Sequence, residues 1–149
     1  MKEERKKLIT ILIADDDQED RMLAKDALEE SRLANVVHFV EDGEELMHYL
    51  LNKGKYSDKT KYPKPGIILL DLNMPKMDGR EALKEIKSNT HLRAIPIVVL
   101  TTSKAEEDIL KTYNLGVNSF ITKPVTFESL VSVMKTVCKY WFEIVELPA

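Results

Sequence analysis

The sequence predicts an α/β protein built on a doubly wound, five-stranded parallel sheet. Short apolar runs alternate five times with longer segments whose apolar residues recur at helical spacing. The run at 67–70 is continuously apolar, which is typical of a strand buried on both faces of a sheet. Strands that alternate with helices in this way pair in parallel and carry helices on both faces.

The five short apolar runs are the predicted strands, at residues 8–14, 36–40, 67–70, 97–100 and 118–121. The first run ends in three acidic residues, and the third ends at Asp71. An acid at the end of a buried strand is costly unless a partner or a ligand uses it. Because the carboxyl ends of parallel strands share one edge of the sheet, a ligand site is expected at that edge.

Five amphipathic segments are the predicted helices, at residues 18–33, 44–52, 80–88, 103–115 and 126–145. Asp17 is the expected N-cap of the first helix, and Met22 and Leu23 are expected on its apolar face. Ser103 and Glu106 form a capping-box pattern at the start of the fourth helix. The segment at 53–66 is rich in lysine, tyrosine and proline and is predicted to be a long surface loop.

Length and composition predict one domain over residues 1–149, with a core at about 8–145 and no output domain. The chain is 44% hydrophobic and 32% charged, which is typical of a folded globular protein. A net charge of -3, with acids and bases mixed, argues against direct nucleic-acid binding. No run has the length of a signal peptide or a membrane span, and the single cysteine, Cys138, forms no internal disulfide. We therefore expect a cytoplasmic protein.

Polar side chains follow four of the predicted strands and define a candidate site. Asp15 and Asp16 follow the first strand, Asp71 the third, Thr101 the fourth and Lys123 the fifth. Carboxylates held close together repel one another, and a bound cation relieves that repulsion. Hard oxygen ligands with positions left for water suit Mg²⁺. Taken singly, each residue is also consistent with a solvated loop, a turn cap or a surface lysine, but their coincidence at four strand ends favours a site.

A phosphoryl group on Asp71 would give each member of this set a role. A carboxylate can act as a nucleophile and form an aspartyl phosphate, and Mg²⁺ can orient the phosphoryl group and neutralise its charge. Lys123 offers a cation to the phosphoryl oxygens, and the Thr101 hydroxyl can donate a hydrogen bond to one of them.

At these residues the sequence resembles the receiver domains of two-component response regulators, over about residues 8–145. The resemblance implies a flavodoxin-like (βα)5 fold and a phosphoacceptor at Asp71. It implies Mg²⁺ held by Asp16, Asp71 and the backbone carbonyl of Asn73, with Asp15 supporting through water. The motifs that carry it are ILIADDD at 11–17, LLDLNMPKMDG at 69–79, VLTTS at 99–103 and FITKP at 120–124.

The resemblance also assigns roles near the phosphoryl group. Lys123 and Thr101 would contact it, and Phe120 would be the aromatic switch that turns inward as Thr101 moves. A plain core position for Phe120 is the alternative interpretation. The Lys123–Pro124 bond would be cis, which is uncommon for bonds before proline.

Two further features resemble the small single-domain regulators that pair with phytochrome-type histidine kinases. One is the enlarged loop at 53–66, and the other is the long final helix with its aromatic end. Such regulators are often dimers through the face of the fourth helix, fifth strand and fifth helix. Trp141 and Phe142 are the candidate dimer residues, although both could instead cover the base of the sheet.

The predicted function is that of a stand-alone receiver that accepts a phosphoryl group from a sensor histidine kinase and signals by a change of surface or oligomeric state. It would catalyse only its own phosphorylation and dephosphorylation. One alternative is a phosphatase with an aspartyl nucleophile, but such enzymes commonly carry a second acid where this chain has Asn73. The other is a receiver that is never phosphorylated and acts as a binding module, against which the intact acidic set argues.

Overall fold

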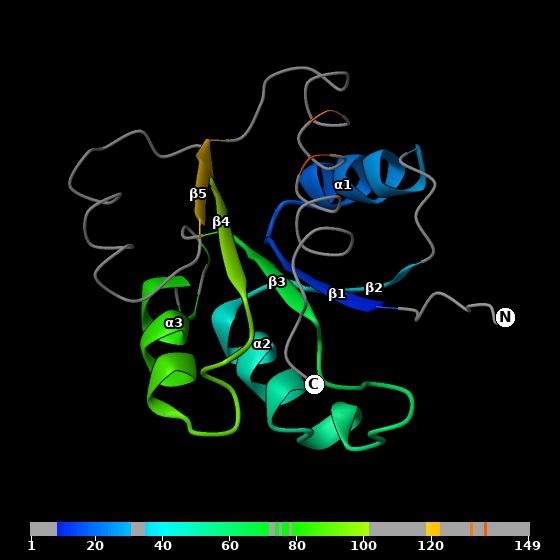
Figure 1. Cartoon of the computed structure of the whole chain (residues 1–149). Helices are drawn as coiled ribbons and strands as arrows, with labels where there is room; N and C mark the ends of the chain where they lie inside the picture. Colours follow the sequence, from blue (N-terminus) through cyan, green and yellow to red (C-terminus); the bar gives the residue numbers. More distant parts are fainter. Residues whose placement is uncertain are drawn as a thin grey trace, which may run out of the picture.

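A five-stranded parallel sheet is the centre of the computed structural model, which describes residues 9–30, 35–71, 74, 76–77, 79–101, 119–122, 132 and 136 (Figure 1). The strands lie in the order β2-β1-β3-β4-β5, and all neighbours are parallel. This order is that of the flavodoxin-like fold, so the predicted fold is confirmed. The strands are β1 (Ile9–Ala14), β2 (Asn35–Val40), β3 (Ile67–Leu70), β4 (Ile97–Thr101) and β5 (Ser119–Thr122).

Helices cover both faces of this sheet. The helix α1 lies on one face, and α2 and α3 lie on the other (Figure 1). The predicted helices at 103–115 and 126–145 lie outside the described residues, apart from Ser132 and Thr136, which are helical. The described helices are α1 (Gln18–Glu30), α2 (Gly43–Leu50), the short 3-10 helix η1 (Gly54–Tyr56) and α3 (Gly79–Ser88). None of them combines the length and the apolar character needed to cross a membrane.

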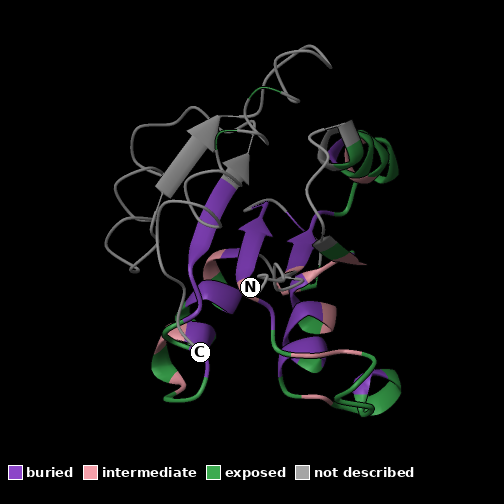
Figure 2. Cartoon of the chain, turned by 45° about the vertical axis from the view of Figure 1, so that its right-hand side comes forward, coloured by how far each residue is buried: buried purple, intermediate pink, exposed green. Residues whose placement is uncertain are grey.

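The main core lies between the sheet and the helices α2 and α3. Strands β1, β3 and β4 are buried along most of their length, and so are the inward faces of the two helices (Figure 2). Leu46 of α2 and Leu83 and Ile86 of α3 are each 0% exposed. Helix α2 is therefore fixed to the sheet by its own apolar face.

The predicted apolar face of α1 is wrong for two residues. Met22 and Leu23 are 58% and 40% exposed, whereas Ala24 is buried. The Nη1 of Arg21 donates a hydrogen bond of 2.8 Å to the backbone carbonyl of Asp15. Because Arg21 and Ala24 are three residues apart, they share one side of the helix, and the bond to Asp15 turns that side toward the sheet.

The segment after α2 adds aromatic side chains to the core, which the prediction of a surface loop missed. The ring centres of His38, Tyr49 and Tyr62 lie 5.4 to 5.7 Å from one another. The ring centre of Tyr56 lies 5.3 Å from that of Tyr49 and 4.9 Å from that of Tyr62. Two hydrogen bonds from the Asn52 side-chain amide to the carbonyls of Tyr56 and Tyr62 close the segment. The Tyr49 hydroxyl donates to the Pro63 carbonyl at 2.9 Å, and burial raises the pKa of Tyr49 to about 12. We call these four rings the aromatic cluster.

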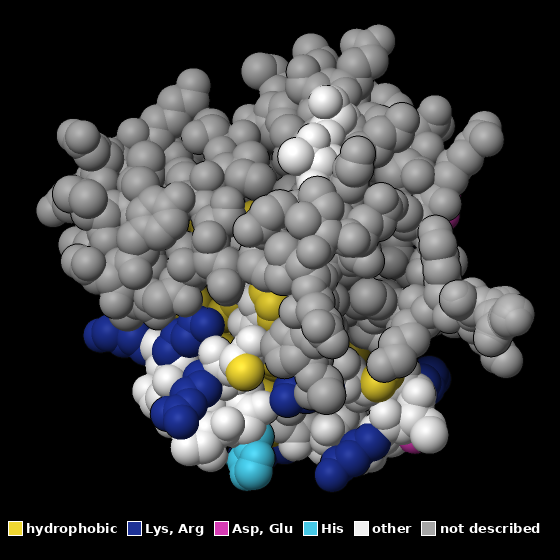
Figure 3. All heavy atoms as spheres, viewed as in Figure 1, with side chains coloured by type: hydrophobic (Ala, Val, Ile, Leu, Met, Phe, Trp, Pro, Cys, Tyr) yellow, Lys and Arg dark blue, Asp and Glu magenta, His cyan; other side chains and the backbone are white. Residues whose placement is uncertain are grey.

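The lysines of this segment lie on its outside. All five are exposed, which fits a solvated surface over the aromatic cluster: Lys53, Lys55, Lys59, Lys61 and Lys64. Lysine and arginine side chains stand out around the lower part of the surface in Figure 3, over α3 and the segment after α2. The ammonium groups of Lys55 and Lys61 lie 5.2 and 5.5 Å from the ring centres of Tyr56 and Tyr62. Their stems therefore cover the cluster while their charges remain in water.

We predict that His38 makes the protein less stable in mild acid. Burial among the rings, with a smaller effect from the Lys61 charge, lowers the pKa of His38 below its ordinary value of 6.5. The unfolded chain therefore binds a proton more readily than the folded one, and stability is lost as the pH falls below about 6.5. The side-chain Nε2 of His38 is buried without a hydrogen-bond partner among the described residues. A proton bound there would therefore have no hydrogen-bond acceptor.

Urea unfolding at several pH values should show this loss in the wild type and less of it in His38→Phe, which keeps a ring and removes the titrating group. His48→Phe, at an exposed position of α2, is the matched control and should follow the wild type. Equal pH slopes for His38→Phe and the wild type would contradict the prediction.

Candidate functional site

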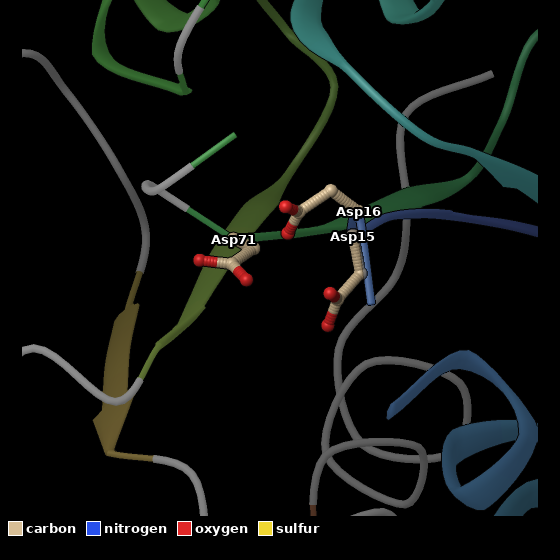
Figure 4. A group of neighbouring side chains, drawn as sticks. All are labelled: Asp15, Asp16 and Asp71. Carbon is tan, nitrogen blue, oxygen red and sulfur yellow. The ribbon is translucent and has the colours of Figure 1, made fainter. Parts of the chain in front are cut away.

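Three carboxylates meet at the carboxyl ends of β1 and β3 (Figure 4). One oxygen from each of Asp15, Asp16 and Asp71 can be chosen so that all three atoms lie within 4.8 Å of one another. Asp15 and Asp71 are 5% and 8% exposed, while Asp16 is exposed. The predicted gathering of these acids at one edge of the sheet is therefore observed.

Strand pairing creates this meeting point. Ala14 at the end of β1 is level with Leu70 at the end of β3 and with Val40 at the end of β2. The amide of Asp71 donates to the carbonyl of Ala14 at 2.9 Å, and the amide of Asp15 donates to the carbonyl of Val40 at 3.0 Å. The order of the strands reverses between β1 and β3, which is where α/β sheets of this kind bind ligands.

The three acids after β1 have two different roles, since Asp15 and Asp16 belong to the carboxylate site and Asp17 caps a helix. The side chain of Asp17 caps α1 by accepting hydrogen bonds from the amides of Glu19 and Asp20 at 2.8 and 3.1 Å. The predicted cap is thus confirmed, and Asp17 is engaged away from the three carboxylates. Asp15 instead accepts a hydrogen bond from the amide of Asp17 at 3.0 Å, which orients its carboxylate at the strand end.

Arg21 supports the site and was missed by the sequence interpretation. Its guanidinium donates to the Asp15 carbonyl at 2.8 Å and lies 3.8 Å from the Glu41 carboxylate. A basic residue near the start of a helix opposes the helix dipole. That position, shortly after an acidic strand end, was the available signal that Arg21 has a specific partner.

The donor set fits a divalent cation. Each of the three carboxylates offers an oxygen, and oxygens are the ligands preferred by Mg²⁺ and Mn²⁺. The exposure of Asp16 leaves one side of the site open to solvent, so water or a phosphoryl oxygen can complete the coordination.

The other predicted site residues are only partly described. Thr101 ends β4, and its backbone is level with Thr122 of β5. Phe120 lies in β5 beside Val99, and the side chains of Thr101 and Phe120 are not described. Outside the described residues lie Asn73, Lys123, Pro124, Trp141 and Phe142.

We predict that Asp16→Asn uncouples stability from divalent cations. Without a cation the variant should be slightly more stable than the wild type, because one of three close like charges is removed. With Mg²⁺ at 100 times its dissociation constant, the wild type should gain about 2.7 kcal/mol, and the variant at the same concentration much less. Urea unfolding with and without Mg²⁺ measures both effects. Glu29→Gln, on the exposed side of α1, is the control, and an equal gain in Asp16→Asn would contradict the prediction.

Known proteins resemble this chain in sequence and in fold. The model of the response regulator receiver domain matches residues 11–135. Response regulator Rcp1 of Synechocystis sp. is 40% identical over 139 residues, which cover 93% of this chain and 92% of Rcp1.

Two solved structures extend the comparison, each at 40% sequence identity. The phosphorylated cyanobacterial phytochrome response regulator RcpA superposes with a TM-score of 0.89, over 96% of this chain and all of that chain (100%). The Mn²⁺-bound form of Rcp1 superposes with a TM-score of 0.86, over 95% of this chain and 99% of that chain. The chain therefore belongs to the family of response regulator receiver domains.

Proposed function

We propose that this receiver takes a phosphoryl group on Asp71 from a sensor histidine kinase. The observation that carries the proposal is the position of Asp71, buried at the end of β3 and within 4.8 Å of two further carboxylates. A nucleophilic oxygen of Asp71 would attack the phosphorus while the bond to the kinase histidine breaks, so the phosphoryl group moves and the histidine leaves. RcpA, which superposes closely on this chain, has been solved in a phosphorylated form.

The proposed cofactor is Mg²⁺, held by Asp15, Asp16, Asp71 and the backbone carbonyl of Asn73. The closeness of the three carboxylates supports the ligand set, and the Mn²⁺-bound structure of Rcp1 supports a divalent ion in this family. When bound, the ion neutralises charge on the phosphoryl oxygens. Asp16 would hold the ion directly and Asp15 would support it through water, and an oxygen of Asp71 would remain as the nucleophile.

The other residues proposed to act on the phosphoryl group come from the ends of β4 and β5. Lys123 would contact the phosphoryl oxygens, and Thr101 would donate a hydrogen bond to one of them. Phe120 would then turn inward as Thr101 moves, and the Lys123–Pro124 bond would be cis. A phosphoryl group that favours one conformation by about 1.4 kcal/mol shifts the equilibrium tenfold.

The proposed setting is a cytoplasmic phosphorelay. A kinase of the phytochrome type is supported by the description of RcpA as a phytochrome response regulator. A single receiver domain over 1–149 is supported by the match to nearly the full length of Rcp1. The protein would then signal through a changed surface and catalyse only its own phosphorylation and dephosphorylation, with no direct contact to nucleic acid or membrane.

We expect acetyl phosphate and Mg²⁺ to add one phosphoryl group to the protein, and Asp71→Asn to abolish the addition. An amide at this position is a far poorer nucleophile than a carboxylate. Intact-mass spectrometry measures the adduct, and Asp26→Asn, at an exposed position of α1, is the matched control. An unmodified wild type with every phosphodonor would contradict the proposal. Fast turnover of unrelated phosphoesters would instead favour the phosphatase.

We also propose a homodimer through the face of the fourth helix, fifth strand and fifth helix, with Trp141 and Phe142 as the candidate interface residues. Large aromatic side chains commonly dominate such interfaces. Light scattering should give a dimer mass for the wild type, a monomer mass for Trp141→Ala, and a dimer mass for the conservative control Trp141→Phe. A monomer mass for all three proteins would remove this proposal.

A further inference from the structure

The first residue of α2 touches the backbone of the loop that follows Asp71. The amide of Gly43 donates a hydrogen bond of 2.8 Å to the carbonyl of Met77. A Cβ atom on Gly43 would lie 2.0 Å from that carbonyl oxygen, 2.7 Å from its carbon and 2.9 Å from the Met77 Cβ. Any other residue here would collide with backbone, so glycine is required for close approach.

A second contact lies beside the first. The Nζ of Lys76 is 3.9 Å from an oxygen of Asp42, which also caps α2 by accepting a hydrogen bond from the Glu45 amide at 2.7 Å. Lys76 has a positive φ of 64°, a conformation that residues other than glycine rarely adopt without a local reason. Met77 packs against the core cluster, and Met74 is buried within it. We call the contacts of Gly43 and Asp42 with Met77 and Lys76 the latch.

The latch and the site lie at the two ends of one short segment. Asp71 is tied to β1 by its hydrogen bond to Ala14, and Met77 is tied to α2 by its hydrogen bond from Gly43. Helix α2 cannot yield easily, since most of its apolar residues are buried against the sheet: Leu46, Met47, Tyr49 and Leu50. A side chain added at Gly43 would therefore displace Met77, which is only partly buried, more readily than the helix.

We infer that Gly43 is a positioning residue for the metal site: the latch fixes Lys76 and Met77, and through the chain that joins them to Asp71 it sets the geometry in which the three carboxylates hold a divalent cation. The inference rests on the proposed function, because it concerns the same ion. Residues that hold ligands in place without touching the metal can change metal affinity by tenfold or more.

The test is the affinity for Mn²⁺ alone, measured by electron paramagnetic resonance of the free ion at a temperature where all variants are folded by circular dichroism. Gly43→Ala should bind Mn²⁺ about tenfold more weakly than the wild type. Gly54→Ala is the matched control, because Gly54 has a positive φ of 59° and no neighbour within 4 Å of an added Cβ. That control strains the backbone far from the site and should keep the affinity of the wild type.

A second variant keeps the inference testable if Gly43→Ala does not fold. Lys76→Gly removes the contact with Asp42 while easing the positive φ, so folding is not at risk, and Mn²⁺ should bind about threefold more weakly. A wild-type affinity in every variant that folds would overturn the positioning role alone. Absence of Mn²⁺ binding by the wild type would overturn the proposed metal site, and the positioning role with it.

Discussion

The pairing of β1 with β3 is the constraint on which the site depends. It places the ends of two buried strands side by side, and each end continues into a carboxylate that is less than one tenth exposed. Like charges so close together oppose folding unless their surroundings compensate. The backbone hydrogen bonds of Asp15 and Asp71 hold the two residues there regardless of that repulsion. Sheet formation thus sets the backbone positions of Asp15 and Asp71, the two buried carboxylates of the site.

The aromatic cluster extends this support to the other side of α2. The Glu45 carboxylate accepts hydrogen bonds from the Tyr56 hydroxyl and from the Glu41 amide in the turn before α2. Burial alone would raise the pKa of Glu45, but these bonds, led by the one from Tyr56, and the nearby Lys55 ammonium together lower it. Glu45 therefore remains charged and joins the cluster to the turn that carries Gly43. A segment that reads as a surface insertion thus supports the helix start on which the loop after Asp71 rests.

Local sequence signals predicted the strands and the acidic site, whereas close approaches between distant segments escaped them. The apolar run at 67–70 indicates a buried strand, and the acid that follows it at Asp71 indicates a site at the end of that strand. The exposure of Met22 and the closeness of Gly43 to Met77 depend on where another segment lies. The tyrosines after α2 are spaced irregularly, so no period indicated that they pack together. The spacing of apolar residues indicates which face of a helix or strand is buried. It does not indicate how close that element lies to another one.

If Asp71 takes the phosphoryl group, the rigid side of the site determines where the response travels. On the β1 side, Asp71 is tied to Ala14, and the loop beyond it is tied to Gly43. A phosphoryl group adds charge and three acceptor oxygens that this side has little freedom to follow. The response is then expected on the β4 and β5 side, where Thr101 ends its strand level with Thr122 and Phe120 lies beside Val99. One side of the site is thus held in place while the other can respond. In such an arrangement a small shift at the site moves neighbouring elements, because a packed core does not deform continuously.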